Sequence, residues 1–218
     1  MLRFGPATGP VVVAALPLFE EANRTRTFVV TLLRALAERG IASALPDLPG
    51  QGESLVPLET VRIMQMREAY QAAVESLQSP AYALGIRSGA LLDTFALLNG
   101  RWHLTPQSGS ELLRELKRVR QSAGREVLGE SWWAADAVTE IGGNRLSIDL
   151  LSELTALAPF DGTSLTTLRT VRHDSDVKAA DLKVPGAPLW RRAEPDNDLA
   201  LAELLANDIA SWVRACEG

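Results

Sequence analysis

The strongest constraint on the fold is the alternation of short apolar segments with longer amphipathic ones along the first hundred residues. Three short apolar runs are typical of strands buried on both faces of a sheet: Val11 to Leu16, Ile41 to Leu45 and Ala81 to Leu84. Each is followed by a segment with the apolar spacing of a helix, at residues 27–39, 58–77 and 89–98. This order predicts an α/β chain with a doubly wound, mostly parallel sheet.

The alternation stops after residue 106. Residues 107–164 are more polar and largely helical in pattern, and a strand resumes only at Leu165 to Val171. We therefore expect a core made of residues 1–106 and 165–218. Residues 107–164 are expected to form a helical lid inserted over the carboxyl-terminal edge of the sheet.

Two later segments complete the expected core. Residues Ala187 to Arg191 are expected to form the last short strand, and Leu199 to Val213 a closing amphipathic helix. In the lid, a basic stretch interleaved with leucines predicts an amphipathic helix with a solvated cationic face, and its alternative role is attraction of an anionic substrate or lipid surface. Its basic residues are Arg114, Lys117, Arg118, Arg120 and Arg125.

The composition narrows the class of partner. A net charge of -5 argues against general nucleic-acid binding, which needs a basic surface, so a small molecule or a protein is the expected partner. No apolar run approaches the roughly 20 residues that span a bilayer, so no transmembrane segment is expected. The single cysteine, Cys216, lies in an expected exposed tail and suits a reducing cytoplasm. The composition does not predict the oligomeric state.

Two glycine-bearing turns follow predicted strands in a fixed order. Residues 47–54 read D-L-P-G-Q-G-E-S, which resembles the D-x-x-G-x-G-x-S turn of α/β-hydrolases. Residues 85–89 read G-I-R-S-G and stand between a strand and a helical segment, where that fold carries its G-x-S-x-G nucleophile elbow. We call residues 85–89 the elbow. The pair of motifs implies an α/β-hydrolase-like fold.

The centre of the elbow is Arg87, where a hydrolase has its catalytic serine. A guanidinium stays protonated and has no lone pair for attack, so it cannot be an acyl-accepting nucleophile. Ser88 lies one residue later and is expected to open the following helix, with the alternative that it is a shifted nucleophile. Arg87 therefore predicts that serine-hydrolase chemistry is lost.

The histidines give an independent test, because a triad needs an imidazole to accept the proton of the nucleophile. The chain has two, His103 and His173, and we expect both to be structural or exposed polar residues. The stretch after the expected last strand, residues 194–197, contains none, although triad order places the base there. A nucleophile and a base are thus both missing from their places.

The exit from the first strand adds a third motif. Residues 17–26 read P-L-F-E-E-A-N-R-T-R and lie where hydrolases build the oxyanion hole. Together with the two turns, this run resembles the exosortase A system-associated hydrolase family, type 2, which has a P-x-x-E-E-x-N-x-x-R run and an arginine in its elbow. The resemblance implies a bacterial protein linked to exopolysaccharide and protein-sorting gene clusters, and it implies no particular activity.

Two roles are open for Arg87. It can bind a carboxylate or phosphate beside a helix N-terminus, or it can pair internally with Glu20 or Glu21 from the neighbouring exit loop. Because the elbow and the exit loop meet at one edge of the sheet, both contribute to the candidate anion site. Its residues are Leu18, Phe19, Glu20, Glu21, Asn23, Arg26, Arg87 and Ser88.

Three functions remain in competition. The first is a pseudo-hydrolase that binds an anionic small molecule or partner segment, and the third is an interaction partner of the exopolysaccharide machinery. The second is an active esterase, thioesterase or acyltransferase that uses Ser88 or an activated water. No cofactor and no metal are expected in any of them.

Overall fold

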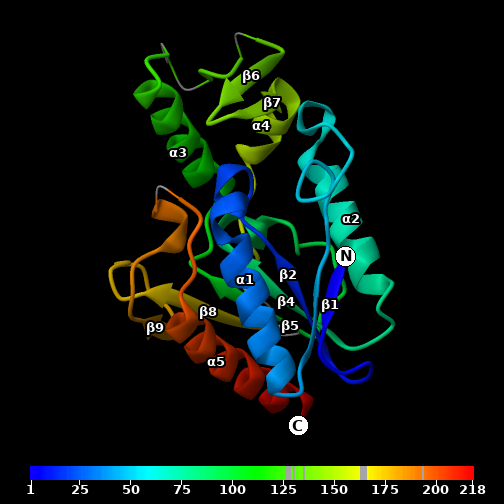
Figure 1. The fold of residues 1–218 in the computed structure, drawn as a ribbon. Coiled ribbons are helices and arrows are strands. Elements are labelled where there is room, and N and C mark those ends of the chain that lie inside the picture. Colours follow the sequence, from blue (N-terminus) through cyan, green and yellow to red (C-terminus); the bar gives the residue numbers. More distant parts are fainter. Residues whose placement is uncertain (126–128, 130, 135, 163–165, 193) are drawn as a thin grey trace.

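The computed structural model of the chain describes residues 1–218 except 126–128, 130, 135, 163–165 and 193. Its centre is a seven-stranded sheet with the order β1-β3-β2-β4-β5-β8-β9 (Figure 1). The strands are β1 (Leu2–Phe4), β2 (Val11–Ala15), β3 (Ala42–Leu45), β4 (Ala81–Ile86), β5 (Gly100–Leu104), β8 (Thr167–His173) and β9 (Leu182–Val184).

The sheet is mostly parallel, as predicted. Strands β3, β2 and β4 are parallel neighbours, and β5, β8 and β9 continue the sheet in the same sense. Within the described residues of this sheet, the one antiparallel pairing is that of β1 with β3. The sequence analysis did not identify β1 as a separate strand, because its three residues lack a buried apolar run.

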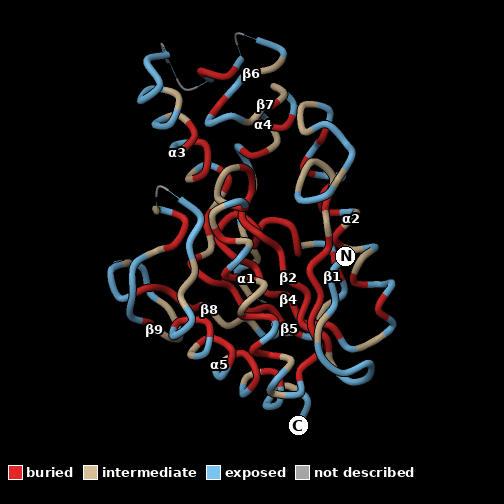
Figure 2. The backbone as a smooth tube through the Cα atoms, in the orientation of Figure 1, coloured by how far each residue is buried: buried red, intermediate tan, exposed pale blue. Residues whose placement is uncertain are grey.

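Alternate residues of the central strand β2 bury against opposite layers. Val11 and Val13 belong to one core cluster with the helix α2 (Ile63–Glu75). Val12 and Ala14 belong to a second cluster with α1 (Glu20–Glu38) and α5 (Leu199–Glu217). Figure 2 shows the central strands β2 and β4 buried along their length between these layers. Burial on both faces accounts for the continuous valine and alanine run.

The flanking helices are longer or shorter than the sequence predicted. α1 begins at Glu20 rather than at residue 27, and it ends before Gly40, whose φ of 75° a side chain would disfavour. The predicted helix 58–77 divides into a 3₁₀ turn, Leu58–Thr60, and α2. α5 is confirmed but runs on to Glu217, so Cys216 lies half-buried in a helix and the predicted exposed tail is wrong.

The predicted helix after the elbow, residues 89–98, is absent. The chain makes only a 3₁₀ turn, Arg87–Leu91, and then bends irregularly into β5. Arg67 donates a hydrogen bond to the Leu91 carbonyl, and Arg101 donates to the carbonyls of Asp93 and Ala96. Buried arginines thus satisfy carbonyl groups that an α-helix would have used for itself.

The insertion lies over the carboxyl-terminal edge of the sheet, and it holds a β-hairpin besides the expected helices. It contains the helices α3 (Gly109–Ser122) and α4 (Ile148–Leu154), with an antiparallel hairpin between them. The hairpin strands β6 (Val138–Ile141) and β7 (Asn144–Ser147) turn at two consecutive glycines, both with positive φ. Consecutive glycines are typical of a hairpin turn, but the sequence analysis did not predict the two strands that flank it.

The position predicted for the last strand, Ala187 to Arg191, is also wrong. The last strand is β9, whereas residues 187–191 contribute a 3₁₀ turn, Leu189–Arg191. Pro188 precedes that turn and has no N–H to donate to a strand ladder. No helix in the described part of the chain is long and apolar enough to cross a membrane.

Candidate functional site

The elbow has the backbone geometry of a strained strand-to-turn junction. Arg87 follows β4 with a φ of 54°, in the left-handed region that side chains rarely adopt. A Cβ at Gly89 would lie 2.2 Å from the Ala15 carbonyl oxygen, and one at Gly85 would lie 2.9 Å from the His103 ring. The two glycines are therefore required by close approach, as the motif predicts.

The Arg87 side chain is buried and paired on two sides. Its Nε and Nη2 donate to the Glu21 carboxylate at 3.2 Å each, and Nη2 also donates to Glu115 at 2.8 and 3.0 Å. The predicted internal pair with Glu21 is thus confirmed, whereas Glu20 pairs with Arg24 instead. Gln107 donates a further hydrogen bond, 2.7 Å, to Glu115.

The cluster has more carboxylates than cations, because Glu21 and Glu115 share the one guanidinium of Arg87. Burial alone would lower the pKa of Arg87, but Glu21 and Glu115 outweigh it and raise that pKa, so the guanidinium stays charged. Burial raises the pKa of Glu21 above its ordinary value despite the nearby Arg87. Arg87 is therefore already neutralised by the protein, and it is not a free anion receptor.

Trp190 lies against the other side of Arg87. The guanidinium carbon is 4.9 Å from the Trp190 ring centroid, a cation–π contact. Trp190 follows the last strand, where triad order would place the catalytic histidine. At this place in the fold an arginine and a tryptophan are in contact where a serine and a histidine would be.

Ser88 is completely buried and its hydroxyl is engaged. Its Oγ accepts a hydrogen bond of 2.9 Å from the backbone N–H of Leu18. Leu18 belongs to the strand-exit loop that supplies one oxyanion-hole donor in hydrolases. The same hydrogen bond therefore occupies both the candidate nucleophile and a candidate oxyanion donor, and no contact between Ser88 and either histidine is found.

Both histidines are buried rather than exposed. His103 bonds Asp93 at 2.7 Å, and Arg101 pairs with the same fully buried carboxylate at 3.3 Å. This group holds the segment after the elbow in place. His173 ends β8, with its ring 5.4 Å from that of Trp190. Burial lowers its pKa, and the Pro185 and Gly186 carbonyls only partly oppose this.

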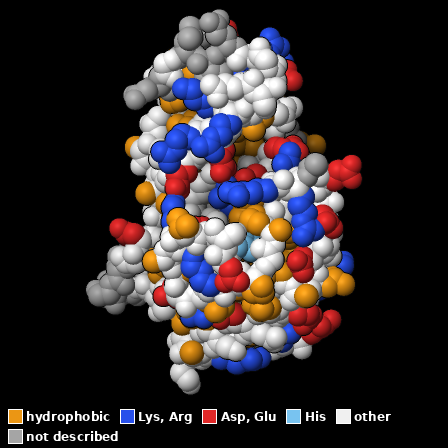
Figure 3. Space-filling view, turned by 90° about the vertical axis from the view of Figure 1, so that its left-hand side faces the viewer, with side chains coloured by type: hydrophobic (Ala, Val, Ile, Leu, Met, Phe, Trp, Pro, Cys, Tyr) orange, Lys and Arg blue, Asp and Glu red, His pale blue; other side chains and the backbone are white. Residues whose placement is uncertain are grey.

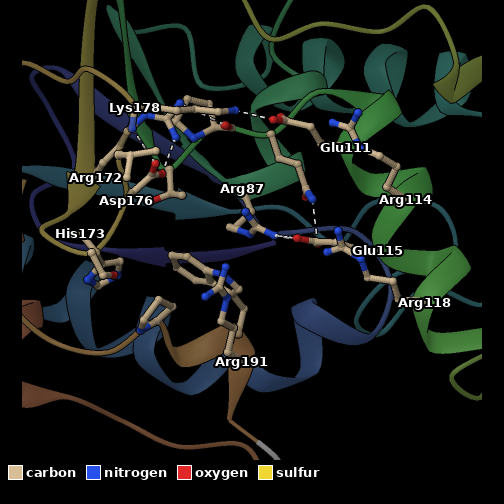
Figure 4. Close-up of a pocket in the computed structure, with 17 residues that line it drawn as sticks. Arg87, Glu111, Arg114, Glu115, Arg118, Arg172, His173, Asp176, Lys178 and Arg191 are labelled. Atoms are coloured by element: carbon tan, nitrogen blue, oxygen red, sulfur yellow. Dashed lines mark hydrogen bonds and ion pairs between the residues drawn. The ribbon is translucent and has the colours of Figure 1, made fainter. Parts of the chain in front are cut away.

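A cavity opens between the elbow, the end of β8 and the insertion helix α3 (Figure 4). Its volume is about 330 Å³, within the roughly 300–1,000 Å³ of small-molecule sites. We call it the polar cavity. Its charged lining residues are Arg87, Glu111, Arg114, Glu115, Arg118, Arg172, Asp176, Lys178 and Arg191. Figure 3 shows Lys and Arg side chains gathered about a hollow on this face.

A second hollow of about 450 Å³ adjoins the first, and we call it the apolar groove. It lies between the exit loop of β2 and the other side of α3. Its apolar lining residues are Leu18, Phe19, Leu112, Leu116, Val119, Ile141 and Trp190. Glu115, Arg118, Trp190 and Arg191 line both hollows, so the two lie side by side.

The structure brings together most of the residues that the sequence analysis assigned to the site. Leu18, Phe19, Glu20 and Glu21 line the apolar groove, and Arg87 lines the polar cavity. Two assigned residues lie elsewhere on α1. Asn23 is exposed and lines neither hollow, and Arg26 pairs with Asp47 at 3.4 Å.

Other lining residues were missed. The sequence analysis noted only the basic residues of α3 and did not identify Glu115 as a site residue. Glu115 lies on the same face of α3 as Leu112 and Leu116, which are buried in the core, and this position could have indicated its role. Trp132 and Trp133 of the insertion are buried in a turn and pack edge to face at 5.5 Å. Within the described residues, no group of three or more His, Cys, Asp or Glu could hold a metal ion.

Comparison with known proteins identifies the fold and nothing finer. No family model matches the chain, and no curated protein does. Among solved structures, Est1E from Butyrivibrio proteoclasticus with ferulic acid bound superposes with a TM-score of 0.65 at 14% identity, covering 98% of this chain and 93% of that one. Mouse alpha/beta hydrolase domain-containing protein 10 gives 0.60 at 12%, covering 98% and 93%.

A third match is a structure from the study of LipS and LipT, two metagenome-derived lipolytic enzymes, with a TM-score of 0.55 at 15% identity and coverage of 98% and 96%. All three matches extend over nearly the whole of each chain, so the likeness includes the sheet, the flanking helices and the insertion. The chain therefore has the α/β-hydrolase fold, with an arginine at the centre of its elbow.

Proposed function

We propose that this chain is a non-hydrolytic protein of the α/β-hydrolase fold that binds an anionic small molecule or partner segment. The observation that carries the loss of hydrolysis is Arg87 at the elbow, buried against Trp190 and paired with Glu21 and Glu115. The other cations that line the polar cavity support the binding of an anion. Neither the arginine nor the tryptophan can replace the serine and histidine of a triad. The fold keeps a cleft while lacking the groups that cleave.

The arrangement of Ser88 supports the same conclusion. Its hydroxyl is hydrogen-bonded to the Leu18 N–H, and no base among the described residues bonds it. Attack on a carbonyl would therefore break a buried hydrogen bond without gaining a proton acceptor from these residues. The Leu18 N–H would also be lost as an oxyanion donor. One such donor contributes roughly 2.7–4 kcal/mol of transition-state stabilisation in a serine hydrolase.

Hydrolysis by Ser88 or by an activated water is the second candidate. The similarity in fold to the structure from the study of LipS and LipT, two lipolytic enzymes, favours this candidate. A fluorophosphonate probe separates the two functions, since it labels only an activated nucleophile. We expect no covalent adduct on the native chain by intact-mass measurement. An adduct mapped to Ser88, absent from Ser88→Ala, would establish the hydrolase.

We further propose a place for the protein beside the bacterial exosortase and exopolysaccharide machinery, in the cytoplasm. This part rests on the motif resemblance of residues 17–26 and 85–89 and on a single cysteine. Affinity purification of the tagged chain from its own bacterium should recover components of that machinery. Recovery of none of them, with the tagged chain folded and abundant, would contradict this assignment.

A further inference from the structure

The polar cavity is cationic although the whole chain is acidic. Its lining carries six cations, namely Arg87, Arg114, Arg118, Arg172, Lys178 and Arg191, against three carboxylates. The chain as a whole has a net charge of -5. A local excess of positive charge in an acidic protein raises the local concentration of anions.

The three carboxylates of the cavity are already engaged. Asp176 pairs with Arg172 at 2.7 Å, Glu111 pairs with Lys178, and Glu115 pairs with Arg87. The remaining cations are Arg114, Arg118 and Arg191, which are exposed at the rim (Figure 4). No carboxylate among the described residues lies within 4 Å of their charged nitrogens.

Deeper in the same cavity, buried polar atoms lack partners. Thr105 Oγ1, Gln107 Oε1 and Arg172 Nε have no hydrogen-bond partner among the described residues, and the three residues are 7%, 2% and 8% exposed. An unsatisfied buried polar group costs about 1–3 kcal/mol, so such groups gather where a ligand or water completes them. Thr105 also has a φ of 47°, a strained value for a β-branched residue.

The apolar groove supplies the opposite chemistry next to this cavity. Leu18 and Phe19 form one wall, and Val119, which is 43% exposed, lies on the opposite helix. Arg118 and Arg191 line both hollows and stand at their junction. A ligand that extends across this junction would thus contact cations at one end. At the other end it would contact a mostly apolar wall, whose lining also includes Glu20, Glu21 and Arg24.

We infer that the ligand is an amphiphile, with an anionic carboxylate or phosphate head in the polar cavity and an apolar tail in the apolar groove. The inference rests on the proposed function and adds the chemical class of the ligand. Arg118 and Arg191 contact the head, with the buried Arg172 Nε and Thr105 hydroxyl as further donors. Arg87 is already paired with Glu21 and Glu115 and does not itself receive the head.

Isothermal titration of the full chain tests the inference, with probes kept below their micelle-forming concentrations. The probes are decanoate, decyl phosphate, decanol and inorganic phosphate. Decanoate or decyl phosphate should bind on the order of tenfold more tightly than decanol, which has the tail without the charge. The tighter of the two anions identifies the head group, and inorganic phosphate should bind more weakly than decyl phosphate.

Variants assign each end of the ligand to its hollow. Arg118→Gln combined with Arg191→Gln should remove the preference for the anions over decanol, while Arg125→Gln, an exposed cation of the same insertion outside both hollows, should leave it intact. Val119→Asn should weaken decanoate and decanol alike. Circular dichroism checks that each variant is folded, and all the changed residues are exposed.

Three results would overturn the inference: no binding of either anionic amphiphile, decanol binding as tightly as decanoate, or inorganic phosphate binding as tightly as decyl phosphate. These titrations measure occupancy, whereas the fluorophosphonate experiment measures a reactive nucleophile. Adduct formation at Ser88 with normal amphiphile binding would refute the non-hydrolytic function and leave the ligand class standing. Absence of both would refute the ligand class alone.

Discussion

Removal of the elbow arginine should destabilise the fold strongly. In Arg87→Ala the Glu21 carboxylate loses its bidentate partner, and its side chain is only 17% exposed. Breaking a buried ion pair from one side costs about 3–5 kcal/mol, because the remaining charge is left without compensation. Loss of the Trp190 contact adds about 0.5–2 kcal/mol. The Glu115 arm adds little, since that side chain is 35% exposed.

Urea unfolding followed by circular dichroism measures this free energy, and thermal melts give a second estimate. For a chain of this size each kcal/mol corresponds to roughly 2–4 °C, so a total loss of about 3.5–7 kcal/mol should lower the melting temperature by about 7–28 °C. Alanine keeps a Cβ at the positive φ of residue 87, so backbone strain is matched between the two proteins.

The double variant Arg87→Ala with Glu21→Gln isolates the cause. Neutralising the stranded carboxylate should recover on the order of 1 kcal/mol or more relative to Arg87→Ala alone. An Arg87→Ala protein within about 0.5 kcal/mol of the native chain would refute this reasoning, and so would a double variant less stable than the single one. The first result would mean that Arg87 is held for a ligand rather than for the fold.

Three further predictions concern the same edge of the sheet. Arg87→Gly should be more stable than Arg87→Ala by about 1 kcal/mol in urea unfolding, because glycine relieves the positive φ; equal stabilities would contradict the strain. Ser88→Ala should lose about 1–3 kcal/mol, since the buried Leu18 N–H loses its acceptor, and an unchanged melting temperature would show that water replaces it. Burial raises the pKa of Glu21 in the folded state, so between the ordinary pKa of 4.5 and the raised one the folded state keeps a proton that the unfolded state releases. The contribution of this proton to stability is therefore lost as the pH rises above 4.5. Urea unfolding across this range should give a flatter stability profile for Glu21→Gln than for the native chain, and parallel profiles would count against the raised pKa.

The sequence predicted best those parts of the fold that depend on local sequence patterns. The valine run of β2 and the glycines at 85 and 89 each report a local requirement, namely burial on both faces and close backbone approach. The order of the strands indicated Glu20 or Glu21 as a partner of Arg87, since loops after neighbouring parallel strands meet at one edge, and the structure has the pair with Glu21.

The rest depends on contacts between distant residues. The helix after the elbow is missing because Arg67 and Arg101, from other elements, bind its carbonyl groups, and no local propensity reports that. Glu115 reaches Arg87 only because the insertion folds back over the sheet. Trp190 contacts Arg87 from the segment after β9, whereas the sequence placed the last strand at residues 187–191.

The central claim is that the elbow of this chain does not cleave esters. Hydrolysis of p-nitrophenyl butyrate by the purified native chain tests it most directly, with Ser88→Ala as the matched control. We predict that both proteins release nitrophenol at the rate of buffer alone, because Ser88 is hydrogen-bonded to Leu18 and no base contacts it. A native rate clearly above buffer that Ser88→Ala abolishes, while remaining folded, would contradict the account.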